Sequence, residues 1–376
     1  MSHLGKPITV LSDGAIFSLM GGGGIARYFK EIWRRVPARA PEIRFVLDWP
    51  AAAGPAPAGP GLSVVRGFQF RPGRLFIRWN AALHRRALRA VRADIFHSTY
   101  YAPAPVPVPR VVVTAHDLLD EHFHDGFSGN PRQFRLQLRQ TLARADAVVA
   151  VSETTRADVI RFAGVAPDRV VVCPHGVSPS LGSRPAEEQV AAFRARHRLE
   201  RPYLLYVGRH NSYKNLSTLI EGWRLLRESG RTFQLCCVGD DAALPPHLAD
   251  YVARHRLASS LRPLPRLDDA ELAAAYAGAS AFVFPSLWEG FGLPIIEAAA
   301  AGCPLVLSDI PAFREVAGER ACFFDPCSPV SLADALSRAL ADREHPRWTK
   351  QELAGRFDWD ASAEAHAALF RRLMAT

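Results

Sequence analysis

The feature that most constrains the fold is a repeated alternation of short apolar runs with longer amphipathic stretches. One series of runs comprises residues 7–11, 43–47, 94–97, 110–114, 147–151 and 170–173. A second series comprises residues 203–207, 233–238, 281–285, 304–307 and 321–324. Continuous β-branched runs separated by helical patterns are typical of parallel strands covered by helices on both faces. We therefore predict two doubly wound α/β domains.

The chain length and a change in composition place the domain boundaries. A chain of 376 residues is long enough for about two domains. The last run of the first series ends at Cys173, and we expect the boundary after Val177, in a segment rich in proline, serine and glycine that extends to Pro185. We predict an N-terminal domain over residues 1–178, a C-terminal domain over 179–356 and a C-terminal helix over 357–376. Residues 50–61 lie inside the first series, so their prolines and glycines predict a surface loop.

The composition excludes several classes of protein. Hydrophobic residues make up 48% and charged residues 22%, which are globular values and exclude a disordered or fibrous chain. No apolar run reaches the length of a membrane-spanning helix, and the N-terminus has no apolar core of a signal peptide. The six cysteines form no Cys-x-x-Cys pair, which favours a reducing, cytoplasmic location and no zinc site. The net charge of +9 suits polyanions, anionic membranes or phosphorylated small molecules, but no nucleic-acid motif is present.

The segment EGFGLPIIEA, which begins at Glu289, holds two carboxylates around a glycine-rich turn. It follows a predicted strand, and ligands of open α/β sheets bind beyond the carboxyl ends of the strands. Gly290 and Gly292 permit a tight turn, and Pro294 suits the first turn of a helix. Glu289 then lies in a loop and Glu297 in the helix. Both carboxylates are placed to accept hydrogen bonds from sugar or ribose hydroxyls at a helix N-terminus.

A second motif, GRHNSYKN, follows the predicted strand 203–207 and opens another helix. Arg209 and Lys214 supply a guanidinium fork and a point charge, a combination that clamps a pyrophosphate. On the residues alone, two cations beside a loop are also compatible with a solvated surface. As a clamp, the pair would stabilise negative charge on a leaving diphosphate. We therefore expect no metal and no other cofactor.

Four consecutive glycines, Gly21–Gly24, precede the residues IARY. This segment also fits the dinucleotide fingerprint G-x-G-x-x-A, with Asp48 as its acidic residue, so an NAD-dependent oxidoreductase is one alternative. The fingerprint needs its glycines directly after a strand, whereas the run 7–11 ends about ten residues earlier. We predict a loop leading into a helix over residues 25–36. A non-catalytic nucleotide-sugar-binding protein is a second alternative. The presence of both Glu289 and Glu297 argues against it.

The motifs EGFGLPIIEA, GR-x4-KN and GGIARY together resemble those of the retaining GT-B glycosyltransferases of family 4, and in particular bacterial mannosyl- and rhamnosyltransferases. The resemblance implies two facing Rossmann-like domains with a cleft between them and a C-terminal helix that crosses back. It also implies that Glu297 holds the nucleotide ribose and that Glu289 contacts hydroxyls of the donor sugar. Arg209 and Lys214 would hold the donor diphosphate.

The resemblance extends to further positions. It implies a donor-binding role for the loop Gly22, Gly23 and Gly24, for Gly290, Phe291, Gly292 and Leu293 of the turn, and for a base-contacting loop with Arg266 and Leu267. His116, in the segment TAHD, would contact the donor hexose and, with Glu289, Arg209 and Lys214, complete the catalytic set. Arg27, Tyr100 and Asp117 are candidates for the acceptor side. Pro265 and His175 depart from the family pattern, which usually has glycine and asparagine there.

These implications define an expected activity. The chain would move a hexose, by our first hypothesis mannose from GDP-mannose, to a saccharide or lipid-linked acceptor with retention of configuration, in bacterial surface polysaccharide synthesis. A helical pattern over residues 74–92 places Phe76, Trp79, Leu83 and Ala87 on one face and Arg78, Arg85, Arg89 and Arg92 on another. This pattern fits a core-facing helix with a solvated side. It also fits a surface that rests on anionic lipid, which would make the enzyme peripheral on the inner membrane.

Overall fold

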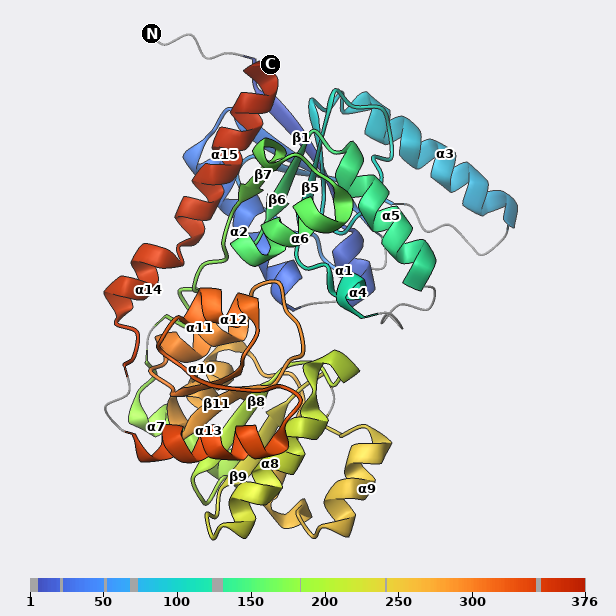
Figure 1. The fold of residues 1–376 in the computed structure, drawn as a ribbon. Coiled ribbons are helices and arrows are strands. Elements are labelled where there is room, and N and C mark those ends of the chain that lie inside the picture. Colours follow the sequence, from blue (N-terminus) through green and yellow to red (C-terminus); the bar gives the residue numbers. More distant parts are fainter. Residues whose placement is uncertain are drawn as a thin grey trace. The chain divides into compact units, whose positions relative to one another are not determined.

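The computed structural model describes residues 6–20, 23–50, 53–67, 74–123, 131–182, 184–240, 242–342 and 346–375. The chain forms two compact units. The first unit comprises Met1–His175 with Asp358–Thr376, and the second comprises Gly176–Phe357. Each unit is built on one parallel sheet with helices packed against it (Figure 1). The predicted class of two doubly wound α/β domains is therefore confirmed.

The first unit has a seven-stranded sheet in the order β3-β2-β1-β4-β5-β6-β7, with every pair parallel. Its strands are β1 (Ile8–Asp13), β2 (Ile43–Trp49), β3 (Leu62–Arg66), β4 (Ile95–Ser98), β5 (Arg110–Ala115), β6 (Ala147–Ala150) and β7 (Val170–Val172). Six of these strands coincide with predicted apolar runs. The sequence pattern missed β3 because this edge strand is largely exposed and carries no continuous apolar run.

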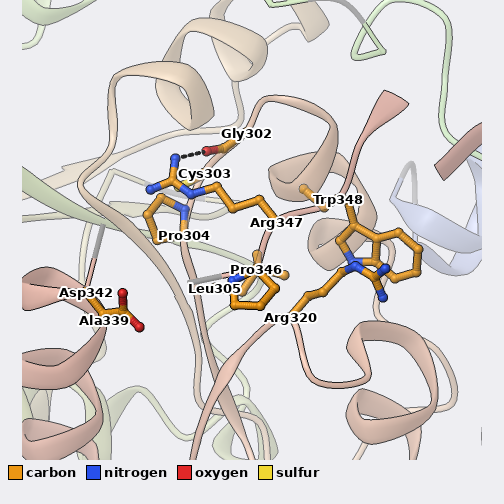
Figure 2. A pocket seen from close by; sticks show the side chains of 11 residues that line it. Gly302, Cys303, Pro304, Leu305, Arg320, Ala339, Asp342, Pro346, Arg347 and Trp348 are labelled. Atoms are coloured by element: carbon orange, nitrogen blue, oxygen red, sulfur yellow. Dashed lines mark hydrogen bonds between the residues drawn. The ribbon is translucent and has the colours of Figure 1, made fainter. Parts of the chain in front are cut away.

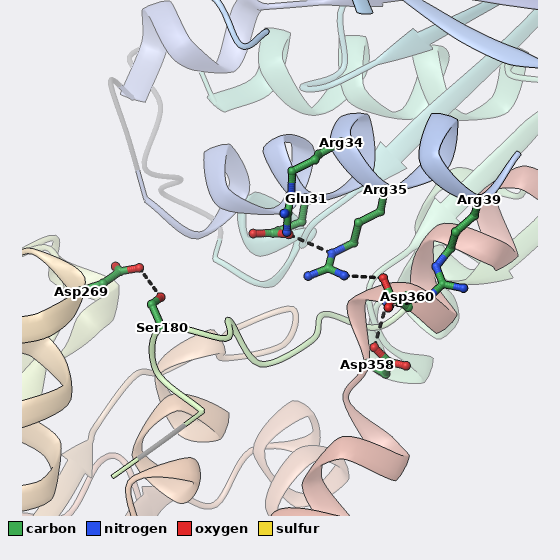
Figure 3. A network of polar contacts seen from close by, with 8 residues as sticks. All are labelled: Glu31, Arg34, Arg35, Arg39, Ser180, Asp269, Asp358 and Asp360. Carbon is green, nitrogen blue, oxygen red and sulfur yellow. Dashed lines mark hydrogen bonds and ion pairs between the residues drawn. The ribbon is translucent and has the colours of Figure 1, made fainter. Parts of the chain in front are cut away.

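The helices of the first unit are α1 (Ala15–Met20), α2 (Gly24–Arg39), α3 (Arg74–Ala90), α4 (Leu119–His122), α5 (Pro131–Arg144), α6 (Glu153–Ala163) and α15 (Trp359–Ala375). The C-terminal helix α15 packs on α2. At this contact Arg35 and Arg39 of α2 both pair with Asp360, and Glu31 accepts a hydrogen bond of 2.9 Å from Arg35 (Figure 3). Helix α6 begins at a side-chain cap, in which Ser152 Oγ accepts a hydrogen bond from the Thr155 amide.

Helix α3 corrects one prediction about the basic segment. Leu83, expected on the core-facing side, is 45% exposed, whereas Leu88 is buried in the core of the first unit. These two residues are five positions apart, so they lie on different faces of a helix. The buried stripe is therefore rotated relative to the predicted one. Phe76, Arg78 and Trp79 lie outside the residues whose side chains are described.

The second unit has a six-stranded sheet in the order β10-β9-β8-β11-β12-β13, again wholly parallel. Its strands are β8 (Tyr203–Val207), β9 (Gln234–Val238), β10 (Leu261–Leu264), β11 (Ala281–Phe284), β12 (Leu305–Ser308) and β13 (Cys322–Phe324). Five of them match predicted runs. Edge strand β10 was missed because its sequence, LRPL, contains an arginine and a proline.

The helices of the second unit are α7 (Glu187–Arg196), α8 (Leu216–Glu228), α9 (Pro246–Arg254), α10 (Asp269–Gly278), α11 (Leu293–Ala300), α12 (Pro311–Ala317), α13 (Pro329–Ala341) and α14 (Lys350–Arg356). When strands are numbered within each unit, the second sheet has the order 3-2-1-4-5-6 of the dinucleotide fold, and the first has the same order with a seventh strand after the sixth. In such sheets the ligand crevice lies where the strand order reverses. The reversal falls between β1 and β4 in the first unit, and between β8 and β11 in the second.

Candidate active site

The reversal point of the second sheet brings two of the predicted motifs together. Strands β8 and β11 pair directly, so the loops that leave their carboxyl ends start at the same edge. The Leu287 amide, in the loop after β11, donates a hydrogen bond of 2.8 Å to the Tyr213 carbonyl, in the loop after β8. The buried side chain of Asn215 donates to the Pro285 carbonyl at 3.1 Å and the Pro326 carbonyl at 2.7 Å. These bonds fix the two loops against each other.

Lys214 and Glu289 form an ion pair at this edge. Lys214 Nζ lies 2.5 Å from Glu289 Oε1, and the two side chains are only 13% and 14% exposed. The buried Ser286 hydroxyl donates to the same carboxylate oxygen at 2.7 Å. The lysine ammonium also lies 5.0 Å from the ring centre of Phe284, within cation–π range. The carboxylate and the ammonium therefore lie side by side, and Glu289 Oε1 accepts hydrogen bonds from both Lys214 and Ser286.

Arg209 lies in the same loop as Lys214 but has a different carboxylate partner. Its Nε is 3.2 Å from Asp240 Oδ2, and the side chains are 30% and 51% exposed. The backbone of Arg209 is fixed because its carbonyl accepts a hydrogen bond of 2.6 Å from the Tyr206 hydroxyl. Burial raises the pKa of Tyr206 well above its ordinary value, so the hydroxyl keeps its proton and donates.

The glycine-rich turn ends at Gly292 and leads into α11. Gly292 has a φ of +98°, and a Cβ there would lie 2.9 Å from Ile295 Cδ1, so the turn requires glycine. Glu297 lies inside α11 with only 6% of its surface exposed, and its Oε2 accepts a hydrogen bond of 3.1 Å from the Tyr276 hydroxyl. Phe291 and Leu293 are buried beside the turn.

The predicted base-contacting loop lies farther along the same sheet. Arg266 is exposed and Leu267 half-buried, in the loop that follows β10. In the sheet order, β9 separates β10 from β8. Asp268, the next residue, caps α10 by accepting a hydrogen bond of 2.8 Å from the Glu271 amide. The cap fixes where the loop ends.

His116 follows β5 in the first unit, at the strand end where the sequence predicted it. The residue is 5% exposed, and its ring lies edge-on to Tyr28 at 5.3 Å and to Phe29 at 5.6 Å between ring centres. Burial, with a smaller contribution from neighbouring His175, lowers the pKa of His116 well below its ordinary value. His116 is therefore a neutral imidazole near pH 7.

Three further histidines are buried around Tyr28 and Phe29 in a cluster that the sequence did not predict. Burial lowers the pKa of His175 to about 3 and of His366 to about 4, and that of His97 well below its ordinary value. His366 Nδ1 lies 2.7 Å from the Ser362 carbonyl, so this nitrogen carries the proton. Its Nε2 then accepts from the Tyr28 hydroxyl at 2.9 Å. Within the described ranges, no three metal-ligating side chains converge as a metal site would need.

The remaining candidates of the first unit lie near the same sheet edge or at the start of α2. Gly22 lies outside the described residues, Gly23 caps α2, and Gly24 is the first residue of that helix. Arg27 is half-buried in its first turn. Tyr100 is half-buried after β4. Asp117 Oδ1 accepts a hydrogen bond of 3.1 Å from the Leu119 amide at the start of α4.

The oxidoreductase alternative depended on where the four glycines lie. Helix α1 (Ala15–Met20) intervenes between β1 and the glycines, so they do not directly follow the strand as a dinucleotide fingerprint requires. Asp48, the proposed ribose ligand of that alternative, lies 2.7 Å from His84 Nε2 instead. Neither feature supports the alternative.

A pocket elsewhere in the second unit is separate from these residues. It is lined by residues that include Gly302, Arg320, Arg347 and Trp348, and Arg347 donates to the Gly302 carbonyl at 3.1 Å (Figure 2). Its interior of about 20 Å³ has room for one water molecule. None of the candidate site residues lines it, and it is too small for a nucleotide.

Two dinucleotide-type units are the fold of the GT-B glycosyltransferases, and the second unit here carries Arg209, Lys214 and Glu289 in the loops beyond its strand ends and Glu297 in α11. Residues 201–342 match the family described as "Glycosyl transferases group 1", and residues 22–181 match "Glycosyltransferase Family 4". The chain is 31% identical over 338 residues to the D-inositol 3-phosphate glycosyltransferase of Kineococcus radiotolerans, a match that covers 80% of this chain and 77% of that one. The chain therefore belongs to the family 4 glycosyltransferases and is a hexosyltransferase.

Other relatives and one solved structure extend this assignment. The O-antigen chain mannosyltransferase B of Escherichia coli is 28% identical over 282 residues, which cover 73% of each chain. The serotype-specific mannosyltransferase WbdA of Escherichia coli is 28% identical over 300 residues, and the match spans only 36% of its length. The structure of Anabaena Alr3699/HepE in complex with UDP-glucose superimposes with a TM-score of 0.73, at 17% identity, covering 98% of this chain and all of the other. This last similarity shows the fold alone.

The sequence named the candidate residues but not the side chains that contact them. Ser286, Asp240 and Tyr276 contact Glu289, Arg209 and Glu297, and none of the three was singled out. Ser286 directly follows a predicted strand and Asp240 lies two residues beyond another, so the ends of the predicted strands pointed to both residues. Tyr276 had none, because it lies inside a helix and reaches Glu297 across 21 positions of sequence.

Proposed function

We propose that the chain is a retaining mannosyltransferase that uses GDP-mannose and extends a saccharide or lipid-linked acceptor in bacterial surface polysaccharide synthesis. The observation that carries the donor site is the meeting of the β8 and β11 loops, which gathers Arg209, Lys214 and Glu289 at one sheet edge. The similarity to the O-antigen mannosyltransferases of Escherichia coli supports the choice of sugar and pathway. The nucleotide sugar in the HepE complex supports a donor of this class.

The contacts of the second unit suggest how the donor would be divided among the residues. Arg209 and Lys214 take the diphosphate, because a guanidinium and an ammonium at one strand edge complement its charge. Glu289 Oε1 is engaged by Lys214 and Ser286, which leaves Oε2 to accept from a sugar hydroxyl. Glu297, whose Oε2 accepts a hydrogen bond from Tyr276 inside the second unit, is assigned to a ribose hydroxyl.

The proposed reaction breaks the bond between the anomeric carbon and the diphosphate oxygen and forms a bond from the acceptor hydroxyl oxygen to that carbon. Negative charge develops on the departing nucleoside diphosphate, where the two cations stabilise it, and we propose that no metal ion is needed. The acceptor proton passes to the leaving phosphate oxygen. We assign Glu289 no role as a glycosidase-type acid, because its Oε1 already accepts hydrogen bonds from Lys214 and Ser286.

In the first unit, we propose that His116 donates or accepts a hydrogen bond with a sugar hydroxyl. The imidazole is neutral, so it presents one N–H and one lone pair without adding charge. Arg27 and Tyr100, both half-buried, remain candidates for contacts with the acceptor.

Peripheral attachment of the enzyme to the cytoplasmic face of the inner membrane is part of the proposal. Across Arg74–Ala90 the sequence contains no acidic residue, and Leu83, Arg85, Arg86 and Arg89 are exposed. An exposed leucine among arginines suits the interface of an anionic bilayer. No helix within the described ranges is both long and apolar enough to cross a membrane. Binding of the enzyme to phosphatidylglycerol vesicles tests whether this face of α3 attaches to membranes. Replacing Arg85 and Arg89 by glutamate should abolish that binding.

The activity is tested by thermal-shift measurements with GDP, UDP, dTDP, their mannose or glucose conjugates, and NADH, followed by a transfer assay. Ligands that bind the folded state raise the melting temperature by mass action. Selective stabilisation by GDP and GDP-mannose, with mannose transfer to a lipid-linked saccharide, is expected. Stabilisation by UDP-sugars alone would show that the donor is a UDP-sugar and not GDP-mannose. Stabilisation by NADH alone would favour the oxidoreductase over the proposed transferase, and nucleotide-sugar binding without transfer to any acceptor would favour the non-catalytic binding protein.

A further inference from the structure

Asp240 lies beside Arg209 because neighbouring parallel strands end at the same level. Strands β8 and β9 pair in register, from Tyr203↔Gln234 to Val207↔Val238. Arg209 lies two residues after the end of β8, and Asp240 two residues after the end of β9. Their side chains approach to 3.2 Å between Arg209 Nε and Asp240 Oδ2.

The loops that carry these two residues are packed closely. The Gly208 amide donates to the Val238 carbonyl at 2.9 Å, which continues the pairing beyond the strands. A Cβ on Gly239 would lie 2.6 Å from His210 Nε2, so the imidazole of His210 rests directly on this glycine. Packing therefore holds the Asp240 carboxylate next to the Arg209 guanidinium.

The two candidate cations of the donor site differ in how firmly they are paired. Lys214 and Glu289 are 13% and 14% exposed, and separating them would leave two poorly solvated charges. Arg209 and Asp240 are 30% and 51% exposed, so water and salt screen their attraction and solvate both groups once apart. An incoming anion therefore separates the Arg209 pair far more easily than the Lys214 pair.

We propose that Asp240 is the counter-ion that holds Arg209 when no nucleotide is bound, and that it weakens nucleoside diphosphate binding and so speeds product release. The inference rests on the proposed function, in which Arg209 contacts the diphosphate. The guanidinium leaves Asp240 for the phosphate oxygens when the donor binds, and Asp240 competes for it again after transfer. With both carboxylates present, the charges of the two cations, Arg209 and Lys214, are balanced by those of Asp240 and Glu289. Competition by Asp240 thus offsets part of the attraction for the anionic product.

The test is isothermal titration of GDP, UDP and dTDP into the wild-type enzyme and into Asp240→Asn, with dissociation rates from stopped flow. The amide keeps the shape of the side chain and removes its charge. The nucleoside diphosphate that binds should bind Asp240→Asn about 2- to 5-fold more tightly, the range expected for loss of one competing exposed ion pair. The gain should appear mainly as slower dissociation. It should shrink in about 0.5 M salt, where the screening length is only a few ångströms.

Two controls separate competition from other effects. Glu228→Gln neutralises another exposed carboxylate of the same unit, which pairs with Arg224 on α8, and it should leave the affinity unchanged. In an Arg209→Ala background, Asp240→Asn should give no gain, since the group for which it competes is gone. An equal gain in that background would overturn the proposal and assign the effect to through-space repulsion.

The outcomes also distinguish this inference from the proposed function. If the wild-type enzyme binds a nucleoside diphosphate and Asp240→Asn does not change its affinity, the role of Asp240 is overturned while the donor site stands. If the wild-type enzyme binds none of the three nucleotides, the proposed function itself is overturned.

Discussion

Replacing Ser286 by alanine should slow sugar transfer while sparing nucleotide binding. Ser286 is fully buried after β11, and its only described role in the site is the 2.7 Å hydrogen bond to Glu289 Oε1. A hydrogen bond to a charged group contributes about 1.5–3 kcal/mol. Glu289 keeps its pairing with Lys214, so we take the lower end of that range, which corresponds to a decrease in kcat of about 10-fold. The loss falls on the carboxylate assigned to the sugar, not on the groups assigned to the diphosphate.

The assay is steady-state transfer with saturating donor and acceptor, beside titration of the nucleoside diphosphate alone. Ser308→Ala is the matched control, because Ser308 is fully buried at the end of neighbouring β12 and its hydroxyl has no hydrogen-bond partner within the described ranges. We expect Ser286→Ala to lower kcat about 10-fold and to leave the Kd of the nucleotide within about 2-fold. An unchanged kcat, or an equal decrease in Ser308→Ala, would refute the positioning role. An equal loss of nucleotide affinity would show instead that Ser286 supports the whole loop.

Three further predictions follow from the contacts. Lys214→Ala should reduce kcat by about 100-fold or more, the usual effect of removing a group that stabilises developing charge, and exposed Lys350→Ala should not; near-normal turnover would remove Lys214 from the clamp. Glu297→Gln should weaken binding of GDP but not of inorganic pyrophosphate, because the residue is assigned to the ribose; equal weakening of both in calorimetry would contradict that assignment. The free energy of unfolding should fall as the pH is lowered from 6.5 toward 4, by up to about 1.4 kcal/mol per pH unit for each fully buried histidine. His366 and His175 have pKa values lowered to about 4 and about 3 in the folded chain, so only the unfolded chain takes up protons across that window; chemical denaturation at several pH values measures the slope, and a flat profile would contradict the buried neutral state.

The sequence predicted the architecture well because the signal was local. Central parallel strands are buried on both faces, so runs such as 203–207 and 281–285 are continuously apolar. The two missed strands, β3 and β10, are edge strands whose exposure permits polar residues and proline. Leu83 was misplaced for a related reason, since an amphipathic pattern with apolar residues on more than one face does not fix which face is buried.

Pairwise contacts within the site were much less predictable. The motif around Glu289 placed it beyond β11, but its pairing with Lys214 joins residues 75 positions apart. Arg209 and Asp240 meet only because β8 and β9 are neighbours in register, which depends on the strand order of the whole sheet. The buried histidines were unpredictable individually, because His97, His116, His175 and His366 come from four separate segments that only the folded unit brings together.

The discontinuous first unit has a consequence for the order in which the chain folds during synthesis. Trp359, His366 and Phe370 of α15 are buried in that unit against Tyr28, Phe45 and His97, although more than 300 residues separate them from α2 in the sequence. The second unit, Gly176–Phe357, is continuous and has all its parts once residue 357 has been made. Domains usually fold from the N-terminus as they emerge from the ribosome. Here part of the apolar core of the N-terminal sheet stays uncovered until residues 358–375 have been synthesised. The nascent first unit is therefore the part of this chain that would depend on chaperones.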